Sequence, residues 1–141
     1  MKIGIALLLT FFVFFQKGNA KNYYQPKSDS VVYYLDLPDS AQFKWYSMDD
    51  VWHKKYYLNL LKENKLKLSC AGCENIYIDV IVEIDKNGKL ISHKLVDGNQ
   101  CGGKPTKKLV SSFIKYWYTY LFPPELRGLK IQIRLGTGLK C

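Results

Sequence analysis

The sequence predicts an α+β fold in which helices cover one small antiparallel sheet. Three segments of the second half alternate apolar and polar residues, as half-buried strands do, and two other segments place apolar residues at helical spacing. The third observation is size: behind an expected leader of 20 residues, the rest of the chain suffices for one two-layered domain but not for two separate cores. We therefore expect a three-stranded sheet in the order strand, strand, helix, strand, preceded by one further helix.

The first 20 residues have the composition of a secretory signal peptide. Lys2 supplies the positive start, an apolar run extends from Ile3 to Phe15, and small residues at Gly18-Asn19-Ala20 fit a cleavage site. The apolar run is well short of the ~20 residues that a membrane-spanning helix needs. We expect cleavage before Lys21 and a secreted or periplasmic protein without stable membrane insertion; the alternative is an uncleaved N-terminal anchor.

After removal of this leader the chain is basic, but its positive charge is dispersed. The leader holds two of the 21 basic residues and none of the 12 acidic ones, which leaves a net charge of about +7. Only Arg127 and Arg134 are arginines, whereas nucleic-acid-binding proteins usually gather arginines and aromatic residues on one face. We therefore expect a basic, solvated surface and no nucleic-acid partner.

Residues 21–47 form a tyrosine-rich segment that Pro26 and Pro38 interrupt. One stretch, from Val31 to Leu37, has the composition of a strand. The composition leaves open whether this segment covers the sheet or lies loose.

A helix is expected from about Met48 to Asn64, because apolar residues recur there at near-helical spacing. Ser47 is its expected N-cap, since a serine followed by acidic residues satisfies the free N–H groups of a helix start. Trp52 and Tyr56, one turn apart on this helix, have the pattern of packing residues. The predicted domain therefore comprises residues 48–141.

The strongest pattern begins after this helix. From Ile76 to Ile84 apolar residues occupy every second position, which predicts a strand with one buried face. Asp85-Lys86-Asn87-Gly88 predicts a tight turn, because Asn-Gly readily adopts the positive φ of a hairpin. The returning strand is expected over Lys89 to Val96, and a loop over Asp97 to Gly103.

The remainder predicts a helix and a final strand. Pro105 or Thr106 opens the helix, which runs to about Leu121 and is stopped by Phe122-Pro123-Pro124. The last strand is expected at Leu129 to Leu135, where charged or polar residues alternate with apolar ones. The apolar side of the helix comprises Leu109, Phe113, Tyr116, Trp117 and Tyr120.

Four cysteines, Cys70, Cys73, Cys101 and Cys141, favour two disulfides in an oxidising compartment, with three possible pairings. The Cys70-Ala71-Gly72-Cys73 spacing also allows a thiol-disulfide redox site. Such a site normally follows a strand and opens a helix, whereas this motif leads into a strand. A four-thiolate zinc site would usually show a second close pair, which Cys101 and Cys141 do not form.

Catalytic patterns are weak, and we expect no catalytic residue, cofactor or resident metal. Asp79 and Glu83 share one strand face, but charged outward faces of strands look the same. The two histidines lie on different elements. Gly102-Gly103-Lys104 lacks the spacing of a phosphate-binding loop. This evidence favours a non-enzyme.

The run from Ile76 to Leu135 resembles the C-terminal domain of the TonB family of energy transducers. It covers about half of the mature chain, and the order and spacing of its elements carry the resemblance. The matching features are the apolar strand, the Asp-x-Asn-Gly-Lys turn, a strand ending in Val96-Asp97-Gly98, the aromatic helix, Phe122-Pro123-Pro124, and Gly128-Leu129-Lys130-Ile131 opening the last strand.

The resemblance implies that the last strand lies at the sheet edge and pairs with an extended segment of a partner. That partner would be an outer-membrane receptor or a second copy of this chain. The alternative is that charges on this strand protect the edge against aggregation. The implied edge comprises Leu129, Lys130, Ile131, Gln132, Ile133, Arg134 and Leu135.

The resemblance also implies that the cysteines gather at one end of the sheet. Cys70 and Cys73 would then each bond to one of Cys101 and Cys141. Two features depart from the family pattern: His93 stands where an apolar residue is usual, and the cysteines are not shared. We also expect this protein to be without the family's transmembrane anchor and proline-rich spacer.

Together these observations predict an exported, non-catalytic protein-binding or structural module that uses its last strand as an edge. The alternative is a secreted thiol-disulfide redox protein that uses Cys70 and Cys73.

Overall fold

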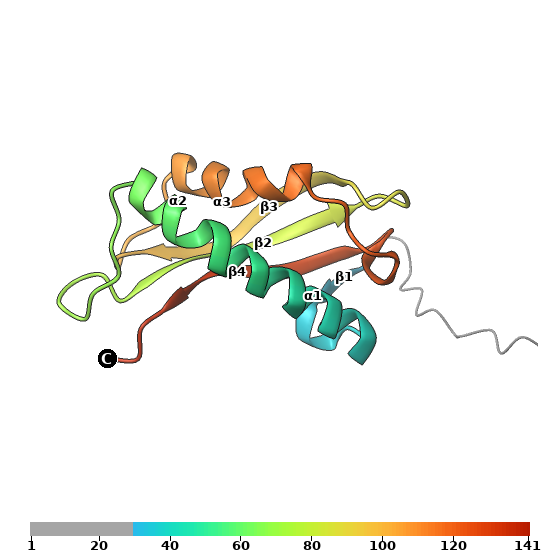
Figure 1. Cartoon of the computed structure of the whole chain (residues 1–141), viewed down its shortest axis with the longest axis horizontal. Coiled ribbons are helices and arrows are strands. Elements are labelled where there is room, and N and C mark those ends of the chain that lie inside the picture. The colour runs from blue at the N-terminus through green and yellow to red at the C-terminus, as the bar shows by residue number, and fades with distance from the viewer. Residues whose placement is uncertain (1–29) are drawn as a thin grey trace, which may run out of the picture.

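The computed structural model describes residues 30–141 and confirms the α+β class. Four strands form one sheet in the order β1-β4-β2-β3, and the helices lie against one of its faces (Figure 1). The prediction of three antiparallel strands is wrong, because a fourth strand, β1, pairs parallel to β4. The strands are β1 (Val31–Tyr33), β2 (Asn75–Ile84), β3 (Leu90–Gln100) and β4 (Lys130–Gly138).

Strand β2 is the centre of the sheet and runs antiparallel to both β3 and β4. Strand β1 lies beside the start of β4, with Val32 opposite Ile131. A parallel neighbour cannot be joined through a hairpin, so this pairing depends on the whole intervening chain returning to the same place. For this reason, hairpin signals in the sequence predicted β2 and β3 but not the β1–β4 pair.

The N-terminal helix begins nine residues before the predicted start. Helix α1 (Asp39–Trp52) continues through a π-helical turn, η2 (His53–Tyr57), into α2 (Leu58–Glu63). Ser47 is not an N-cap, since its hydroxyl donates to the carbonyl of Phe43 one turn earlier. Upstream of Ser47, Ala41 and Trp45 are buried at helical spacing, and this packing extends the helix.

Residues 30–38 belong to the folded domain. The strand expected at Val31 to Leu37 is present only as β1, and a 3-10 turn, η1 (Tyr34–Asp36), follows it. The carbonyl of Pro38 accepts the first N–H groups of α1, from Ala41 and Gln42. This arrangement answers the open question for the described part of the tyrosine-rich segment, because it extends the sheet and leads into the helix that covers it.

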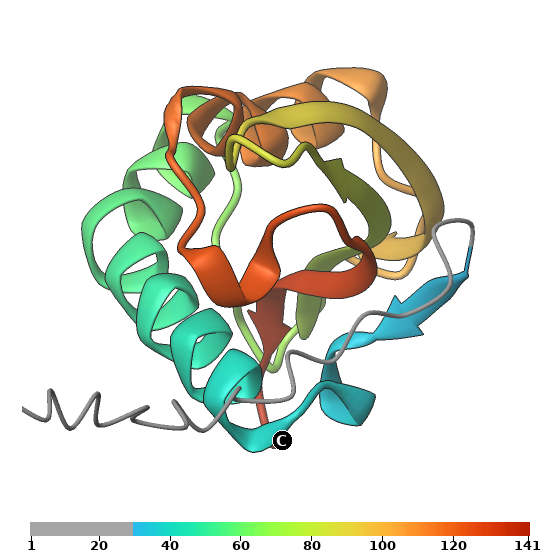
Figure 2. The same cartoon turned by 90° about the vertical axis from the view of Figure 1, so that its right-hand side faces the viewer.

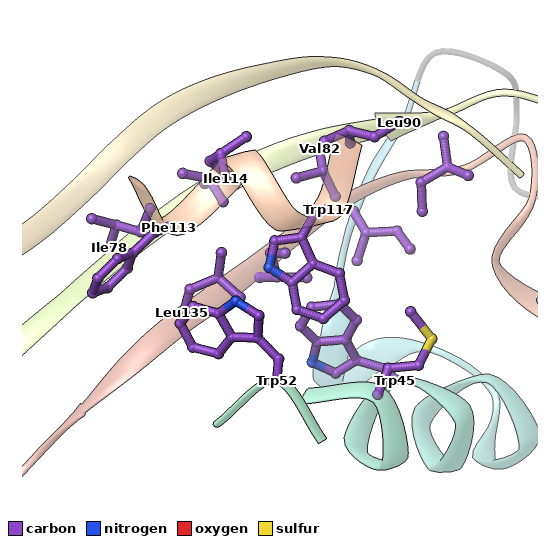
Figure 3. Close-up of a cluster of buried hydrophobic side chains, with 14 of the residues drawn as sticks. Trp45, Trp52, Ile78, Val82, Leu90, Phe113, Ile114, Trp117 and Leu135 are labelled. Carbon is purple, nitrogen blue, oxygen red and sulfur yellow. The ribbon is translucent and has the colours of Figure 1, made fainter. Parts of the chain in front are cut away.

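The core lies between the sheet and the helices (Figures 2 and 3). Trp45 and Trp52 from α1 pack against Trp117 from α3 (Lys107–Thr119), with ring centroids 5.3 and 6.1 Å from that of Trp117. Phe113 and the inward residues of β2 and β4 complete the cluster. Since the three indoles are at most 2% exposed, burial of apolar surface is a major stabilising contribution here.

The predicted hairpin turn is confirmed. The Asp85 carboxylate accepts the N–H groups of Asn87 and Lys89, and these bonds, that from Lys89 first, lower the pKa of Asp85. Gly88 has φ +85°, and a Cβ there would meet the carbonyl of Phe122 at 2.5 Å. Gly88 and Phe122 also share a backbone hydrogen bond, so the turn is fastened to the segment after α3.

Two predicted boundaries need correction. Strand β3 continues through Gln100, so most of the expected loop from Asp97 onward is paired with β2. Strand β4 continues past Leu135 to Gly138. Strand pairing supplies hydrogen bonds to backbones of any sequence, which is why polar and glycine residues could extend both strands. A short 3-10 turn, η3 (Pro124–Leu126), precedes β4.

The π-helical turn places Tyr57 against an irregular part of the sheet. Its hydroxyl donates to the carbonyl of Ile76 at 2.9 Å and accepts the N–H of Thr137 at 3.4 Å. The neighbouring Gly136 has φ +99° and interrupts the regular course of β4. Burial raises the pKa of Tyr57 to about 12, so its hydroxyl remains a donor at neutral pH.

The expected signal peptide at residues 1–20 lies outside the described residues. Within residues 30–141, no helix has the length and apolar character needed to cross a membrane.

Candidate functional site

The last strand, predicted as the free edge, is partly covered. Strand β1 pairs with Lys130, Ile131 and Gln132, so the edge prediction is wrong for these three residues. From Ile133 to Gly138, no described strand pairs with the outer side of β4. The free edge on this side of the sheet is therefore confined to the end of the strand.

The side chains of β4 alternate as the sequence predicted. Leu129 precedes the strand and is buried, and Ile131, Ile133 and Leu135 point into the core. Arg134 lies on the opposite face, where its guanidinium forms two 2.7 Å hydrogen bonds with Asp79 and lies 4.2 Å from the ring centre of Tyr77. The hydrogen bonds to Asp79 raise the pKa of Arg134, so the guanidinium stays charged, and its charge is paired with the Asp79 carboxylate.

On the other side of the sheet, β3 is the edge strand, and no strand among residues 30–141 pairs with its outer side (Figure 1). Every residue from Ile91 to Asp97 is exposed. The register with β2 shifts twice, which leaves Ile91 and Val96 as extra residues in β3. Such bulges bend an edge strand and limit its pairing with other chains, so the regular part of this edge is Ser92 to Leu95.

The hydrogen-bond pattern identifies which backbone groups of β3 face outward. Ile84 donates to the carbonyl of Leu129, so the even-numbered residues of β2 bond toward β4 and the odd-numbered ones toward β3. Residues Ser92 and Lys94, opposite Glu83 and Ile81, therefore bond to β2. His93 and Leu95 present their N–H and C=O groups to the outside.

The side chains of His93 and Leu95 enter a groove between β3 and α3. This groove has a volume of about 630 Å³, within the range of ligand sites. Helix α3 approaches β3 but leaves a gap beside it: Val80 on β2 is fully buried, whereas Leu95 opposite it on β3 is 39% exposed. The groove lining consists of His93, Leu95, Pro105, Lys107, Val110, Ser111, Ile114, Lys115, Tyr118 and Thr119.

The groove has apolar walls and a positive rim. Among the described residues that line the groove, only Lys107 and Lys115 are charged. No acidic side chain among them balances this positive charge. At one end, His93 Nδ1 and the Tyr118 hydroxyl are hydrogen-bonded at 2.9 Å and connect β3 to α3. At the other end, Pro105 packs against Gly98, where a Cβ would approach its ring to 2.5 Å.

The cysteines form two disulfides, Cys70–Cys141 and Cys73–Cys101, which confirms the predicted disulfide bonding. As the resemblance implied, they gather where β2 begins and where β3 and β4 end. Cys70 and Cys73 do not bond to each other. A smaller hollow of about 180 Å³ beside Cys101 is lined by Gly72, Glu74, Asn75, Asn99 and Gly102.

The paired acids considered for catalysis are engaged by neighbours. Asp79 binds Arg134, while Glu83 accepts from Ser92 at 2.9 Å and lies 3.8 Å from Lys130. Within the described residues, no three His, Cys, Asp or Glu side chains form a group that could hold a metal ion. The contacts of Asp79 and Glu83 stabilise the face of the sheet that points away from the helices.

Sequence reasoning missed the groove. It singled out His93 only as a departure from the resemblance, and it left Val110 and Ile114 off the apolar side of the helix. A usable signal was the stripe of Lys107, Ser111 and Lys115, spaced four residues apart on the helix beside an apolar row.

The comparisons with known proteins add no identity to this geometry. The chain matches no protein-family model, no curated protein sequence and no solved structure.

Proposed function

We propose that this protein is an exported, non-catalytic binding module that takes an extended segment of a partner protein against an edge of its sheet. The observation that carries the proposal is the outer side of β3, an edge strand whose outward backbone groups at His93 and Leu95 adjoin a groove. Addition of a strand supplies main-chain hydrogen bonds, and an adjacent groove selects side chains.

The two edges offer different amounts of free backbone. On β4, only Ile133, Arg134 and Leu135 lie between the residues paired with β1 and Gly136, whose positive φ departs from strand geometry, and the exposed Arg134 is already bound to Asp79. On β3, four regular residues between the two bulges are exposed and lie beside apolar walls. We therefore favour β3 over the last strand as the seat of the partner, and retain the end of β4 as the competing seat.

Export is supported by the leader-like composition of residues 1–20 and by the two disulfides, since structural disulfides persist mainly in oxidising compartments. The same pairing removes support from the redox alternative. A redox site at Cys70 and Cys73 needs those two thiols to form the reversible bond, whereas each is bonded to a distant cysteine.

Amide hydrogen exchange tests the proposal residue by residue. Peptides that bind the disulfide-intact protein would be selected from a displayed library of random nonapeptides, and exchange would be followed by NMR with and without the tightest one. In the free protein, we expect slow exchange at Ser92 and Lys94 and fast exchange at His93 and Leu95. Within β3, the bound peptide should slow amide exchange at His93 and Leu95 and leave the other residues unchanged.

Each alternative outcome has a distinct signature. Protection of Arg134 instead of His93 and Leu95 would place the partner on β4, as the TonB resemblance implies. Protection at neither edge, or the failure of any peptide to bind, would refute edge pairing as the function.

A further inference from the structure

We infer that the groove between β3 and α3 selects extended segments in which two acidic residues, four positions apart, flank an apolar residue. This inference rests on the proposed pairing with β3 and specifies the chemistry of the partner at that site. Its basis is the order of charged and apolar side chains along α3.

The walls between the two lysines are apolar. Val110 and Ile114 come from α3, and Leu95 faces them from β3. A strand added beside β3 directs every second side chain to the helix side of the sheet. One such side chain therefore meets the apolar walls, and the next ones on that face, two positions before and after it, lie toward the ends of the groove.

The spacing of the lysines matches the spacing of those outer side chains. Lys107 and Lys115 are eight residues apart on one helix, which corresponds to about 12 Å at 1.5 Å per residue. Residues four apart on a strand are separated by about 13 Å at 3.3 Å per residue, and they share one face. Acidic residues at these two positions can each reach one lysine.

Charge complementarity also points to acids. Lys107 and Lys115 are the charged side chains that line the groove within the described part of the chain, and both are cations; two further lysines, Lys104 and Lys108, lie within three residues of Lys107. An acidic segment would be attracted, whereas a basic one would be repelled. An anionic amphiphile such as a fatty acid would satisfy the lysines and the apolar walls, but it would leave the outward backbone groups of His93 and Leu95 unused. The peptide is therefore the better fit.

Synthetic nonapeptides with capped ends test this inference. The parent alternates threonine and valine, with valine at position 5 and glutamate at positions 3 and 7. Matched peptides carry glutamine or lysine at both positions, or glutamates at positions 3 and 6. Isothermal titration should rank glutamate above glutamine above lysine. The first step should be about threefold to tenfold, the size expected of two exposed ion pairs, and should shrink in high salt.

Charge reversal on the protein provides the decisive comparison. In the double variant Lys107→Glu with Lys115→Glu, the preference should invert, so that the lysine peptide binds more tightly than the glutamate peptide. The control is Lys44→Glu with Lys55→Glu, which makes the same change in net charge at exposed positions outside the groove. This control should keep the original ranking.

The outcomes separate this inference from the proposed function. Equal binding of all peptides, with His93 and Leu95 protected from exchange, would overturn the acidic preference and leave edge pairing intact. Inversion in the control variant as well, or no advantage of positions 3 and 7 over 3 and 6, would also overturn it. If palmitate binds in the groove and no peptide does, both the inference and the edge-pairing function fail.

Discussion

The two edges of the sheet differ in how their backbone hydrogen-bonding groups are paired. On the β4 side, the chain's own segment β1 occupies Lys130 to Gln132, and side chains such as Leu135 are fully buried beneath the helices. On the β3 side, no described strand pairs, two bulges bend the edge, and Leu95 is 39% exposed.

This difference indicates that the pairing and burial of an edge strand depend on the segments that pack beside it. Both strands offer similar backbone groups, but a groove remains between α3 and β3, so apolar side chains of β3 such as Leu95 stay part-solvated and gain less from burial. The β4 side is buried against the core, whereas the β3 side keeps backbone groups that no described strand pairs with. Matched changes on the two sides should therefore differ in their effect.

The largest expected contrast is between two leucines that both point to the helix side of the sheet. Leu135→Ala should lower the free energy of unfolding by about 2–5 kcal/mol, because it leaves a cavity in the core. Leu95→Ala should cost less than about 1 kcal/mol, since this side chain is already part-solvated. Urea unfolding of both variants measures this contrast; equal losses would mean that the β3 side is as well packed as the core.

Removal of the disulfides should come next. Cys73 and Cys101 are 28 positions apart and fasten the end of β3, while Cys70 and Cys141 are 71 positions apart and fasten the C-terminus. Replacing either pair by serine should cost about 2–4 kcal/mol. Only loss of the Cys73–Cys101 bond should speed amide exchange at the end of β3. Guanidinium unfolding and NMR exchange check this; faster exchange there in the Cys70–Cys141 variant would contradict it.

Ionisation of Asp49 on α1 lowers the free energy of unfolding as the pH rises. Burial first, and then the nearby Asp50, raise the pKa of Asp49 from 3.8 to about 6, and its Oδ1 is buried without a hydrogen-bond partner in the described part of the chain. The folded state thus holds this proton more tightly than the unfolded chain does. The cost is absent below pH 3.8 and is complete once the pH rises above about 6.

Asp49→Asn should therefore stabilise the protein by about 1–3 kcal/mol at pH 7.5 and change it little at pH 3.5. Thermal unfolding at the two pH values measures the difference. The control is Asp50→Asn, an exposed residue paired with Lys54, which should be slightly destabilising at pH 7.5. A gain for Asp49→Asn that is the same at both pH values would show that titration is not its cause.

The smallest contrast is between two hydrogen-bonded tyrosines. Tyr57→Phe should cost about 1–2 kcal/mol, because it leaves the buried carbonyl of Ile76 without its donor. Tyr118→Phe on the β3 side breaks the bond to His93 where water can replace the hydroxyl, and should cost less than about 0.5 kcal/mol. Chemical denaturation resolves the two; a larger loss at Tyr118 would mean that the bond across the groove is structural.

Much of the fold followed from local signals. The strand β2, the turn at Gly88, the start of the returning strand and the helix before Phe122 each have a short-range pattern, and the structure contains all of them. The predicted start of α1 was wrong. Ser47 is a residue type that often caps helices, but burial of Ala41 and Trp45 decides where this helix begins. Local chemistry and tertiary packing favoured different starts, and packing prevailed.

The candidate site was less accessible to sequence reasoning. The last strand was recognised, but its coverage by β1 depends on a parallel pair that joins residues about 100 positions apart. His93 was noticed without a role, because only the placement of α3 shows that its side chain enters a groove. The lysine stripe on α3 was readable, but its apolar counterpart on β3 was not.

By itself, the sequence determined the α+β class, the order of the second-half elements, the leader-like start and the presence of an even set of cysteines, because periodicity, turn chemistry and composition act over a few residues. Only the tertiary structure decided which edge of the sheet is closed, which cysteines bond and where a groove forms. Those features arise from contacts between segments far apart in the chain, and their free energy depends on how the helices lie over the sheet.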